Sequence, residues 1–154
     1  MVDYKVHDFV NETASESPAP GGGSVSALSA ALGVALGSMV ANLSADKRGW
    51  EDKLSVFSEW AEKAQNIKRE LMFLVDEDTN AFNKIMDAFQ LPKNTDEEKS
   101  IRSEAIETAS VYATEIPLKT MKVAYSSVEV LKYMVENGNP NSITDAGVGL
   151  LCIK

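Results

Sequence analysis

The sequence predicts an all-α fold, a helical bundle of long helices around one central helix that is rich in small residues. Three observations support this prediction. The segment from Ser17 to Ser44 joins a glycine triplet to a charge-free run of mostly Ala, Ser and Gly. Apolar residues then recur at steps of three or four through the segments that follow, which is the period of an α-helix. No segment shows the strict alternation of a half-buried strand.

Length, charge and cysteine content restrict the class of protein. A chain of 154 residues fits a single domain, residues 1–154, with a full hydrophobic core. The net charge is −8 and the basic residues are scattered, so we expect no nucleic-acid partner. One cysteine, Cys152, and one histidine, His7, exclude a disulfide framework and a Cys/His zinc cluster and disfavour a Ser-His-Asp triad. We therefore expect no metal site.

Two stretches in the first third of the sequence bear on localisation. The first ten residues are partly acidic and have no apolar core, which is unlike a signal peptide, so we expect a cytoplasmic chain. The uncharged run from Val25 to Leu43 is long enough to cross a membrane, and Gly33 and Gly37 have the spacing of paired membrane helices. Its internal serines and lack of aromatic anchors favour a buried helix without a membrane partner.

The first two helices are set by local signals. Residues from about Lys5 to Ala14 predict a short amphipathic helix with Val6, Phe9 and Val10 on one face and Asp3 as its N-cap. The central helix is expected from about Gly23 to Leu43.

A long helix is expected from Trp50 to Phe89, because this stretch has no Gly or Pro and a continuous apolar stripe. The stripe comprises Leu54, Phe57, Ala61, Ala64, Ile67, Leu71, Leu74, Phe82, Ile85 and Phe89. It also passes through position 78, where the residue is Asp78. Asp76 and Glu77 lie off the stripe and are expected to be solvated.

The next helix begins with a capping box at Thr95 and Glu98. Its inner face is expected to contain Ile101, Ala105, Ala109, Tyr112 and Ile116. Pro117 lacks a backbone N–H, so we expect an interruption there and a second segment from Leu118 to Glu136.

Turn-forming residues separate the last two helices expected in the C-terminal part. Asn137-Gly138 predicts a left-handed helix end and Pro140 a stop. A last helix follows, capped by Asn141 or Ser142 and carrying Asp145 in its first turn.

Two features have both a functional and a structural interpretation. The bare backbone of Gly21, Gly22 and Gly23 can present N–H groups to a ligand at a helix start, or it can be a flexible entry to a tightly packed helix. Asp78 on an apolar stripe can act as a general acid or base, or it can pair with a buried lysine or cap a neighbouring helix. On spacing alone, Asp145 favours a helix start and Lys93 a solvated loop.

Four sequence blocks together resemble the cyclodeaminase/cyclohydrolase family of folate enzymes. They are SPAPGGGSVSALSAALGVALGSMVANLS, LVDEDTNAF, LPKNTDEEK and NPNSITDAGV, in this order. The resemblance implies a helical fold, a homodimer or higher homo-oligomer, and a tetrahydrofolate derivative as substrate without a prosthetic group. It implies formiminotetrahydrofolate cyclodeaminase or methenyltetrahydrofolate cyclohydrolase activity. It also implies further helices after Asp145, which this sequence is expected to lack.

The resemblance places a catalytic aspartate in LVDEDTNAF, where Asp76 and Asp78 are both candidates. We favour Asp78, because it lies on the apolar stripe. The segment Gly21–Ser24, Lys93 and Asp145 fall in the other blocks and are expected to bind substrate. The alternatives are a helical folate-binding or dimerisation module without catalysis, and a small membrane-associated protein built on the Gly33-xxx-Gly37 helix.

Overall fold

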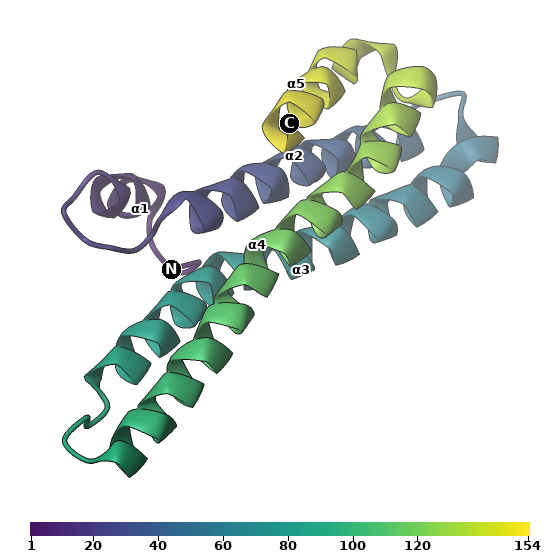
Figure 1. Cartoon of the computed structure of the whole chain (residues 1–154). Coiled ribbons are helices and arrows are strands. Elements are labelled where there is room, and N and C mark those ends of the chain that lie inside the picture. The colour runs from purple at the N-terminus through teal and green to yellow at the C-terminus, as the bar shows by residue number, and fades with distance from the viewer.

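The structure, a computed structural model, describes all residues 1–154 and contains five α-helices and no strand (Figure 1). The helices are α1 (Val6–Thr13), α2 (Gly22–Ala45), α3 (Leu54–Gln90), α4 (Asp96–Asn137) and α5 (Ile143–Ile153). Short 3-10 turns, Glu51–Lys53 and Pro140–Ser142, precede α3 and α5. The all-α prediction is confirmed.

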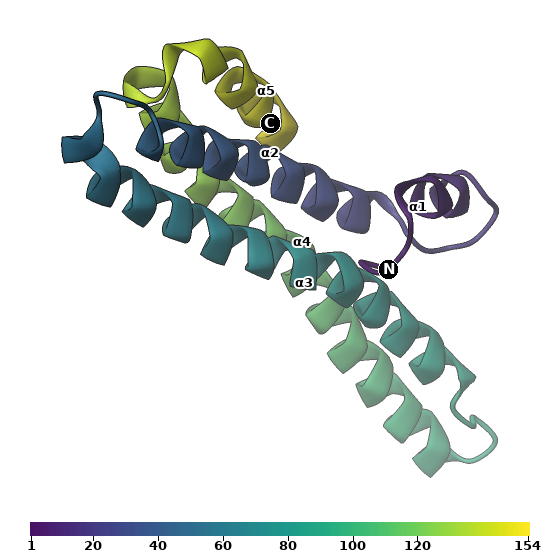
Figure 2. The same cartoon turned by 180° about the vertical axis from the view of Figure 1, so that it is seen from behind.

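The helices α2, α3 and α4 pack lengthwise, and α5 folds back along α2 (Figures 1 and 2). The far ends of α3 and α4 continue beyond the start of α2 as a two-helix arm (Figure 2). The short helix α1 lies beside the start of α2, and the chain end Met1 lies between α1 and α3 (Figure 1). The arrangement brings the start of α2, the middle of α3 and α4, and the end of α5 together.

Small residues let neighbouring helices approach α2 closely, as the sequence predicted. A Cβ atom on Gly33 would lie 2.7 Å from the carbonyl oxygen of Gly149, and one on Gly149 would lie 2.8 Å from the oxygen of Gly33. By length and composition α2 alone could cross a membrane, and 56% of its most apolar window is buried among the other helices. The core helix of a soluble protein has the same properties, so this is weak support for a membrane span.

The aromatic residues of α3 belong to the core, as expected. Phe57 is fully buried and stacks on Trp50, with ring centroids 5.7 Å apart. Trp60 stacks on Tyr133 of α4 at 4.5 Å. These contacts join the start of α3 to the end of α4 and leave no aromatic box for a ligand there.

The expected interruption at Pro117 does not occur, because α4 continues through it from Asp96 to Asn137. A proline inside a helix removes one hydrogen bond and costs about 3 kcal/mol. Ile116 and Thr120, one turn apart around Pro117, are both buried, so tertiary packing holds both halves in one line. The capping box at Thr95 is confirmed: Glu98 N–H donates to Thr95 Oγ1 at 3.1 Å.

Two other local predictions are wrong. Gly138 ends α4 with φ −73°, which is not left-handed. Glycine is favoured there because a Cβ would lie 2.5 Å from the backbone oxygen of Met134 and 2.9 Å from Val40 Cγ1. The N-cap position of α1 is Lys5 rather than Asp3. Of the expected inner face of α1, only Phe9 is buried, because α1 packs on the body through a single turn.

The apolar stripes of α3 and α4 are only partly buried at their far ends. Leu54, Phe89 and Ile101 are about half exposed, at 50%, 49% and 56%. Leu54 lies in the first turn of α3, at the end opposite the arm. In the arm, where Phe89 and Ile101 lie, α3 and α4 pack only against each other, so side chains at the edge of that single interface face solvent. The buried stripe of this part consists of alanines, Ala81, Ala88 and Ala109.

Candidate active site

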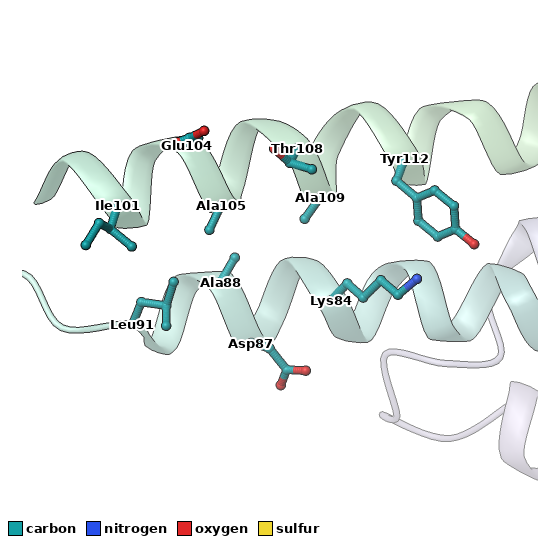
Figure 3. A pocket seen from close by; sticks show the side chains of 10 residues that line it. All are labelled: Lys84, Asp87, Ala88, Leu91, Ile101, Glu104, Ala105, Thr108, Ala109 and Tyr112. Atoms are coloured by element: carbon teal, nitrogen blue, oxygen red, sulfur yellow. The ribbon is translucent and has the colours of Figure 1, made fainter. Parts of the chain in front are cut away.

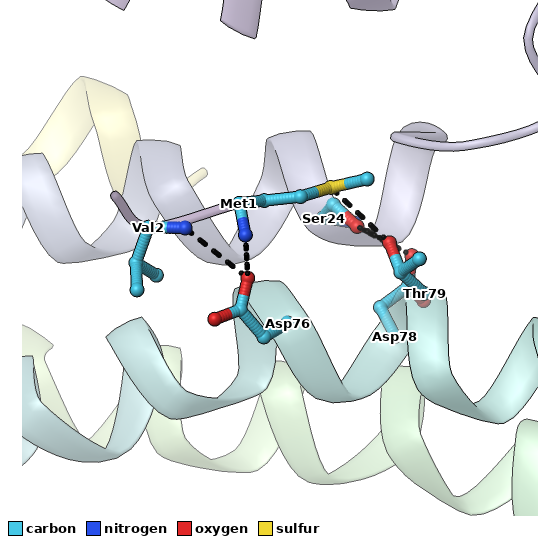
Figure 4. Close-up of polar contacts among 6 residues, drawn as sticks. All are labelled: Met1, Val2, Ser24, Asp76, Asp78 and Thr79. Atoms are coloured by element: carbon cyan, nitrogen blue, oxygen red, sulfur yellow. Dashed lines mark hydrogen bonds and ion pairs between the residues drawn. The ribbon is translucent and has the colours of Figure 1, made fainter. Parts of the chain in front are cut away.

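Asp78 from α3 binds the first turn of α2. Its Oδ2 atom accepts hydrogen bonds from the backbone N–H of Ser24 at 2.8 Å and from the Ser24 hydroxyl at 2.9 Å (Figure 4). The N–H groups of a first helical turn have no partner within the helix, and the positive end of the helix dipole favours a carboxylate there. Asp78 is half-buried. The structure therefore shows the expected helix cap, with the second carboxylate oxygen left free of Ser24.

Gly23 is the residue that makes this approach possible. A Cβ atom at this position would lie 2.0 Å from Asp78 Oδ1 and 2.5 Å from its Cγ. The neighbouring Gly22 has no atom within 4 Å of such a Cβ, and Gly21 has only Pro18 O, at 3.9 Å. At Gly23, the Asp78 carboxylate occupies the space that a side chain would fill, whereas that space is open at Gly21 and Gly22.

A cavity of about 650 Å³ opens beside this contact, between the start of α2, the middle of α4 and the end of α5. Asp78 is the one acidic residue of its lining. The others include the hydroxyl residues Ser26, Ser29 and Thr120 and the cation Lys154. The remaining lining residues are Gly22, Gly23, Val25, Ala30, Pro117, Met121, Ala124, Leu151, Cys152 and Ile153. A largely apolar cavity with one carboxylate held by a helix start suits a flat organic ligand that reacts at one polar point.

Asp76 lies outside this cavity and binds the beginning of the chain. Its Oδ1 atom pairs with the ammonium group of Met1 at 2.6 Å and accepts the N–H of Val2 at 3.1 Å (Figure 4). The Met1 side chain continues towards Thr79, whose hydroxyl lies 3.3 Å from its sulfur atom. Asp76 was expected to be solvated, and it is half-buried under this segment.

The structure does not bring Lys93 or Asp145 to the cavity of one chain. Lys93 lies in the turn at the tip of the arm, and the helix from Asp78 to Gln90 alone spans about 18 Å at 1.5 Å per residue. Asp145 begins α5, where its neighbour Ala146 packs against Val40, about 25 Å along α2 from Gly23. Their expected binding roles stay predictions.

A second cluster, not foreseen from the sequence, lies on the side of α3 that faces α4. Tyr112 donates a hydrogen bond to Glu77, and Lys84 lies 4.0 Å from Glu77 Oε1 and 4.0 Å from the centre of the Tyr112 ring. The bond to Glu77 raises the pKa of Tyr112 above its ordinary value of 10.0, with burial and the charges of Glu77 and Glu115 adding to it.

This cluster closes the inner end of an open cavity of about 700 Å³ between the two helices of the arm (Figure 3). Half of its ten lining residues are alanine or aliphatic, and Asp87 and Glu104 lie at the edges (Figure 3). Glu51, in the turn before α3, is the other residue whose pKa is shifted. The N–H of Gly49 donates a hydrogen bond to its carboxylate, which lowers the pKa. Neither feature lies at the Asp78 cavity.

No group of three His, Cys, Asp or Glu side chains converges in a way that could hold a metal ion. The hydrogen bonds to Asp78 come from the backbone amide and the hydroxyl of Ser24, and that hydroxyl also lies 3.4 Å from the hydroxyl of Thr79.

Fold and cavity together define a class of protein: an α-helical protein in which a carboxylate from one long helix caps the glycine-rich start of another beside a ligand-sized cavity. The family model described as formiminotransferase-cyclodeaminase matches residues 5–154. The chain belongs to this family.

Several known proteins are similar to the chain. Methenyltetrahydrofolate cyclohydrolase of Methylorubrum extorquens is 38% identical over 146 residues, which are 95% of this chain and 70% of that protein. Formimidoyltransferase-cyclodeaminase of Mus musculus is 34% identical over 154 residues, which are 28% of its length. The crystal structure of formiminotetrahydrofolate cyclodeaminase from Thermotoga maritima matches 97% of this chain and 71% of that one, with a TM-score of 0.81 and 27% identity.

Proposed function

We propose that the chain acts on the one-carbon unit carried by tetrahydrofolate, as a formiminotetrahydrofolate cyclodeaminase or a methenyltetrahydrofolate cyclohydrolase. The observation that carries the proposal is the carboxylate of Asp78, fixed by Ser24 on one oxygen and placed in the wall of a cavity of about 650 Å³. Family membership and the names of the similar proteins support the substrate class.

Both reactions pass through a tetrahedral carbon bound to two nitrogens, and both need a proton acceptor and donor beside it. In cyclohydrolysis, water adds to the cationic methenyl carbon and one of its protons goes to Asp78. Asp78 then gives this proton to a folate nitrogen as the bond from that nitrogen to the carbon breaks, and the remaining hydroxyl proton leaves to solvent as the formyl carbonyl forms. In cyclodeamination, the ring-distal nitrogen attacks the formimino carbon and gives its proton to Asp78, which returns a proton to the ammonia as its carbon–nitrogen bond breaks. A positioned carboxylate contributes about 10²- to 10⁴-fold to such transfers.

The first turn of α2 forms one wall of the proposed site. The open backbone of Gly21 and Gly22 gives a folate access to the N–H groups at the helix start, and Gly23 and Ser24 hold the carboxylate. We include Lys93 and Asp145 as substrate contacts that a second chain has to supply, since both lie far from Asp78 within one chain.

We further propose a homodimer or larger homo-oligomer in the cytoplasm, without a prosthetic group, nucleic-acid partner or membrane. Exposed apolar side chains of α4 and α5 outside the Asp78 cavity support contact between chains, notably Leu118, Tyr125 and Val148. Sedimentation velocity of the purified chain tests the assembly, and a monomer at micromolar concentration would contradict it.

Turnover of both folates by wild type and by Asp78→Asn tests the proposed function. The methenyl absorbance falls in cyclohydrolysis and rises in cyclodeamination, so one spectrophotometer trace also decides which reaction occurs. We expect Asp78→Asn to lose at least about 100-fold in kcat, because an amide cannot accept the proton. Asp87→Asn is the matched control, since Asp87 is an exposed carboxylate on the same helix outside the cavity.

Full turnover by Asp78→Asn would refute the role of the carboxylate. Binding of one folate per chain without turnover by the wild type would instead identify a non-catalytic folate-binding module.

A further inference from the structure

Thr120 is a polar residue in the buried apolar stripe of α4, in the same way that Asp78 is a polar residue in the apolar stripe of α3. Thr120 lies between Ile116 and Ala124 at helical spacing, and its exposed fraction is only 6%. It lines the same cavity as Asp78. Because Asp78 comes from α3 and Thr120 from α4, two different helices bring polar groups to one cavity.

The hydroxyl of Thr120 makes no hydrogen bond within the chain. Serine and threonine hydroxyls in helices usually bond to a carbonyl one turn earlier. On the same helix Thr114 does so, with its Oγ1 atom 2.9 Å from the oxygen of Ser110, and Ser127 does so with Ala124. No side-chain oxygen is sealed in the interior without a partner, so the Thr120 hydroxyl opens to the cavity.

The other buried hydroxyls show that this is unusual. Ser24, Ser38 and Ser44 are each satisfied, by Asp78, Gln65 and the Val40 carbonyl respectively. Ser142 also has no side-chain partner, but it lies outside the Asp78 cavity. A buried hydroxyl that faces a cavity is stable when a ligand or a water supplies the missing bond.

We propose that Thr120 binds the small polar group that enters or leaves at the one-carbon unit: the attacking water in cyclohydrolysis, or the departing ammonia in cyclodeamination. This inference rests on the proposed function. Thr120 lines the cavity with only 6% of its surface exposed, which favours a small group as the partner of its hydroxyl. A neutral hydroxyl both donates and accepts, which suits water and ammonia. The apolar Met121 and Ala124 beside it suit the flat carrier instead.

With Thr120 in this role, atoms and protons balance in both reactions. In cyclohydrolysis, Thr120 Oγ1 accepts a hydrogen bond from one O–H of the water. The water oxygen bonds to the methenyl carbon as the carbon–nitrogen π bond opens, and the other proton goes to Asp78. Asp78 then gives that proton to the leaving nitrogen as its bond to carbon breaks, and the O–H proton beside Thr120 leaves to solvent as the carbonyl forms. In cyclodeamination, Thr120 accepts one N–H of the leaving amino group, which takes its extra proton from Asp78 as the carbon–nitrogen bond breaks.

The test compares Thr120→Val, which removes the hydroxyl at nearly constant shape, with Thr120→Ser, which keeps it. We expect Thr120→Val to lower kcat at least about tenfold, the loss of one hydrogen bond in the transition state, with KM within about twofold of wild type. Thr120→Ser should keep kcat within about threefold.

Two controls separate this role from stability. Thr114→Val removes an exposed hydroxyl from the same helix, and Ser142→Ala removes a buried unpaired hydroxyl outside the cavity. Both should match wild type in kcat. Circular dichroism establishes that each variant is folded; if Thr120→Val is not, Thr120→Ala takes its place, with the same expected loss of kcat.

Each outcome decides the matter. A folded Thr120→Val or Thr120→Ala with wild-type kcat overturns the inference and leaves the proposed function standing. A raised KM with unchanged kcat also overturns it, because Thr120 would then bind the carrier. A wild-type chain that turns over neither folate refutes the proposed function, and this inference with it.

Discussion

Replacing Gly23 by alanine tests the link between the glycine turn and the carboxylate. The new Cβ would lie 2.0 Å from Asp78 Oδ1, whereas ordinary contact begins at 3.4 Å. The oxygen must therefore move by the difference, about 1.4 Å. Since the obstructing atom is the end of a flexible side chain rather than backbone, the carboxylate rotates away and the helices stay in place.

The displacement separates an effect on stability from an effect on activity. Loss of two hydrogen bonds from Ser24 to a half-exposed carboxylate costs about 1.5 kcal/mol each, and alanine in a helix returns about 1 kcal/mol, so we expect a net loss of about 2 kcal/mol. A misplacement of about 1 Å in a catalytic group lowers turnover by about 100-fold. Activity should therefore fall far more than stability.

The assay is kcat/KM for the preferred folate, measured beside urea unfolding of the same preparation. Gly147→Ala is the matched control, because Gly147 is a helical glycine in α5 with no atom within 4 Å of a new Cβ. It should keep wild-type kcat/KM. A folded Gly23→Ala variant within threefold of wild type would show that the position of Asp78 does not matter for turnover.

Two further predictions concern stability. The pKa of Tyr112 is raised from 10.0 in the folded chain, so the stabilisation from its bond to Glu77 is complete below about pH 10 and is lost as the pH rises through the folded value. The stability difference between wild type and Tyr112→Phe, from urea unfolding, should be constant from pH 8 to about pH 10 and shrink above it; a constant difference up to pH 11 would contradict this. Gly33→Ala should destabilise the chain by about 1–3 kcal/mol, because its Cβ would lie 2.7 Å from the backbone oxygen of Gly149. Gly147→Ala is again the control, and equal destabilisation by the two substitutions would disprove the close contact between α2 and α5.

The sequence located the central carboxylate but only half described its environment. A polar residue at position 78 of an apolar stripe indicated that Asp78 faces other helices, and it binds the start of α2. The same stripe argument, applied to Thr120 between Ile116 and Ala124, would have found the second polar residue of the cavity. Thr120 was missed because threonine inside a helix usually satisfies its own hydroxyl.

Other site residues needed distances that a sequence does not contain. Lys93 and Asp145 belong to two other blocks of the same family resemblance, yet the arm and the antiparallel course of α5 place both far from Asp78. Asp76 is two residues from Asp78, about 200° around the helix, so it faces the N-terminal segment instead of the cavity.

Helix positions, the capping box at Thr95 and the small-residue character of α2 were determined by the sequence alone, because periodicity and caps depend on neighbours within a turn or two. Tertiary structure decided that α4 passes through Pro117, that Gly23 leaves room for a carboxylate, and that Ser24 holds it. These depend on which helices cross and at what distance, a result of packing between segments more than fifty residues apart. The glycine turn is a predictable helix start, and its contact with Asp78 is what the fold adds.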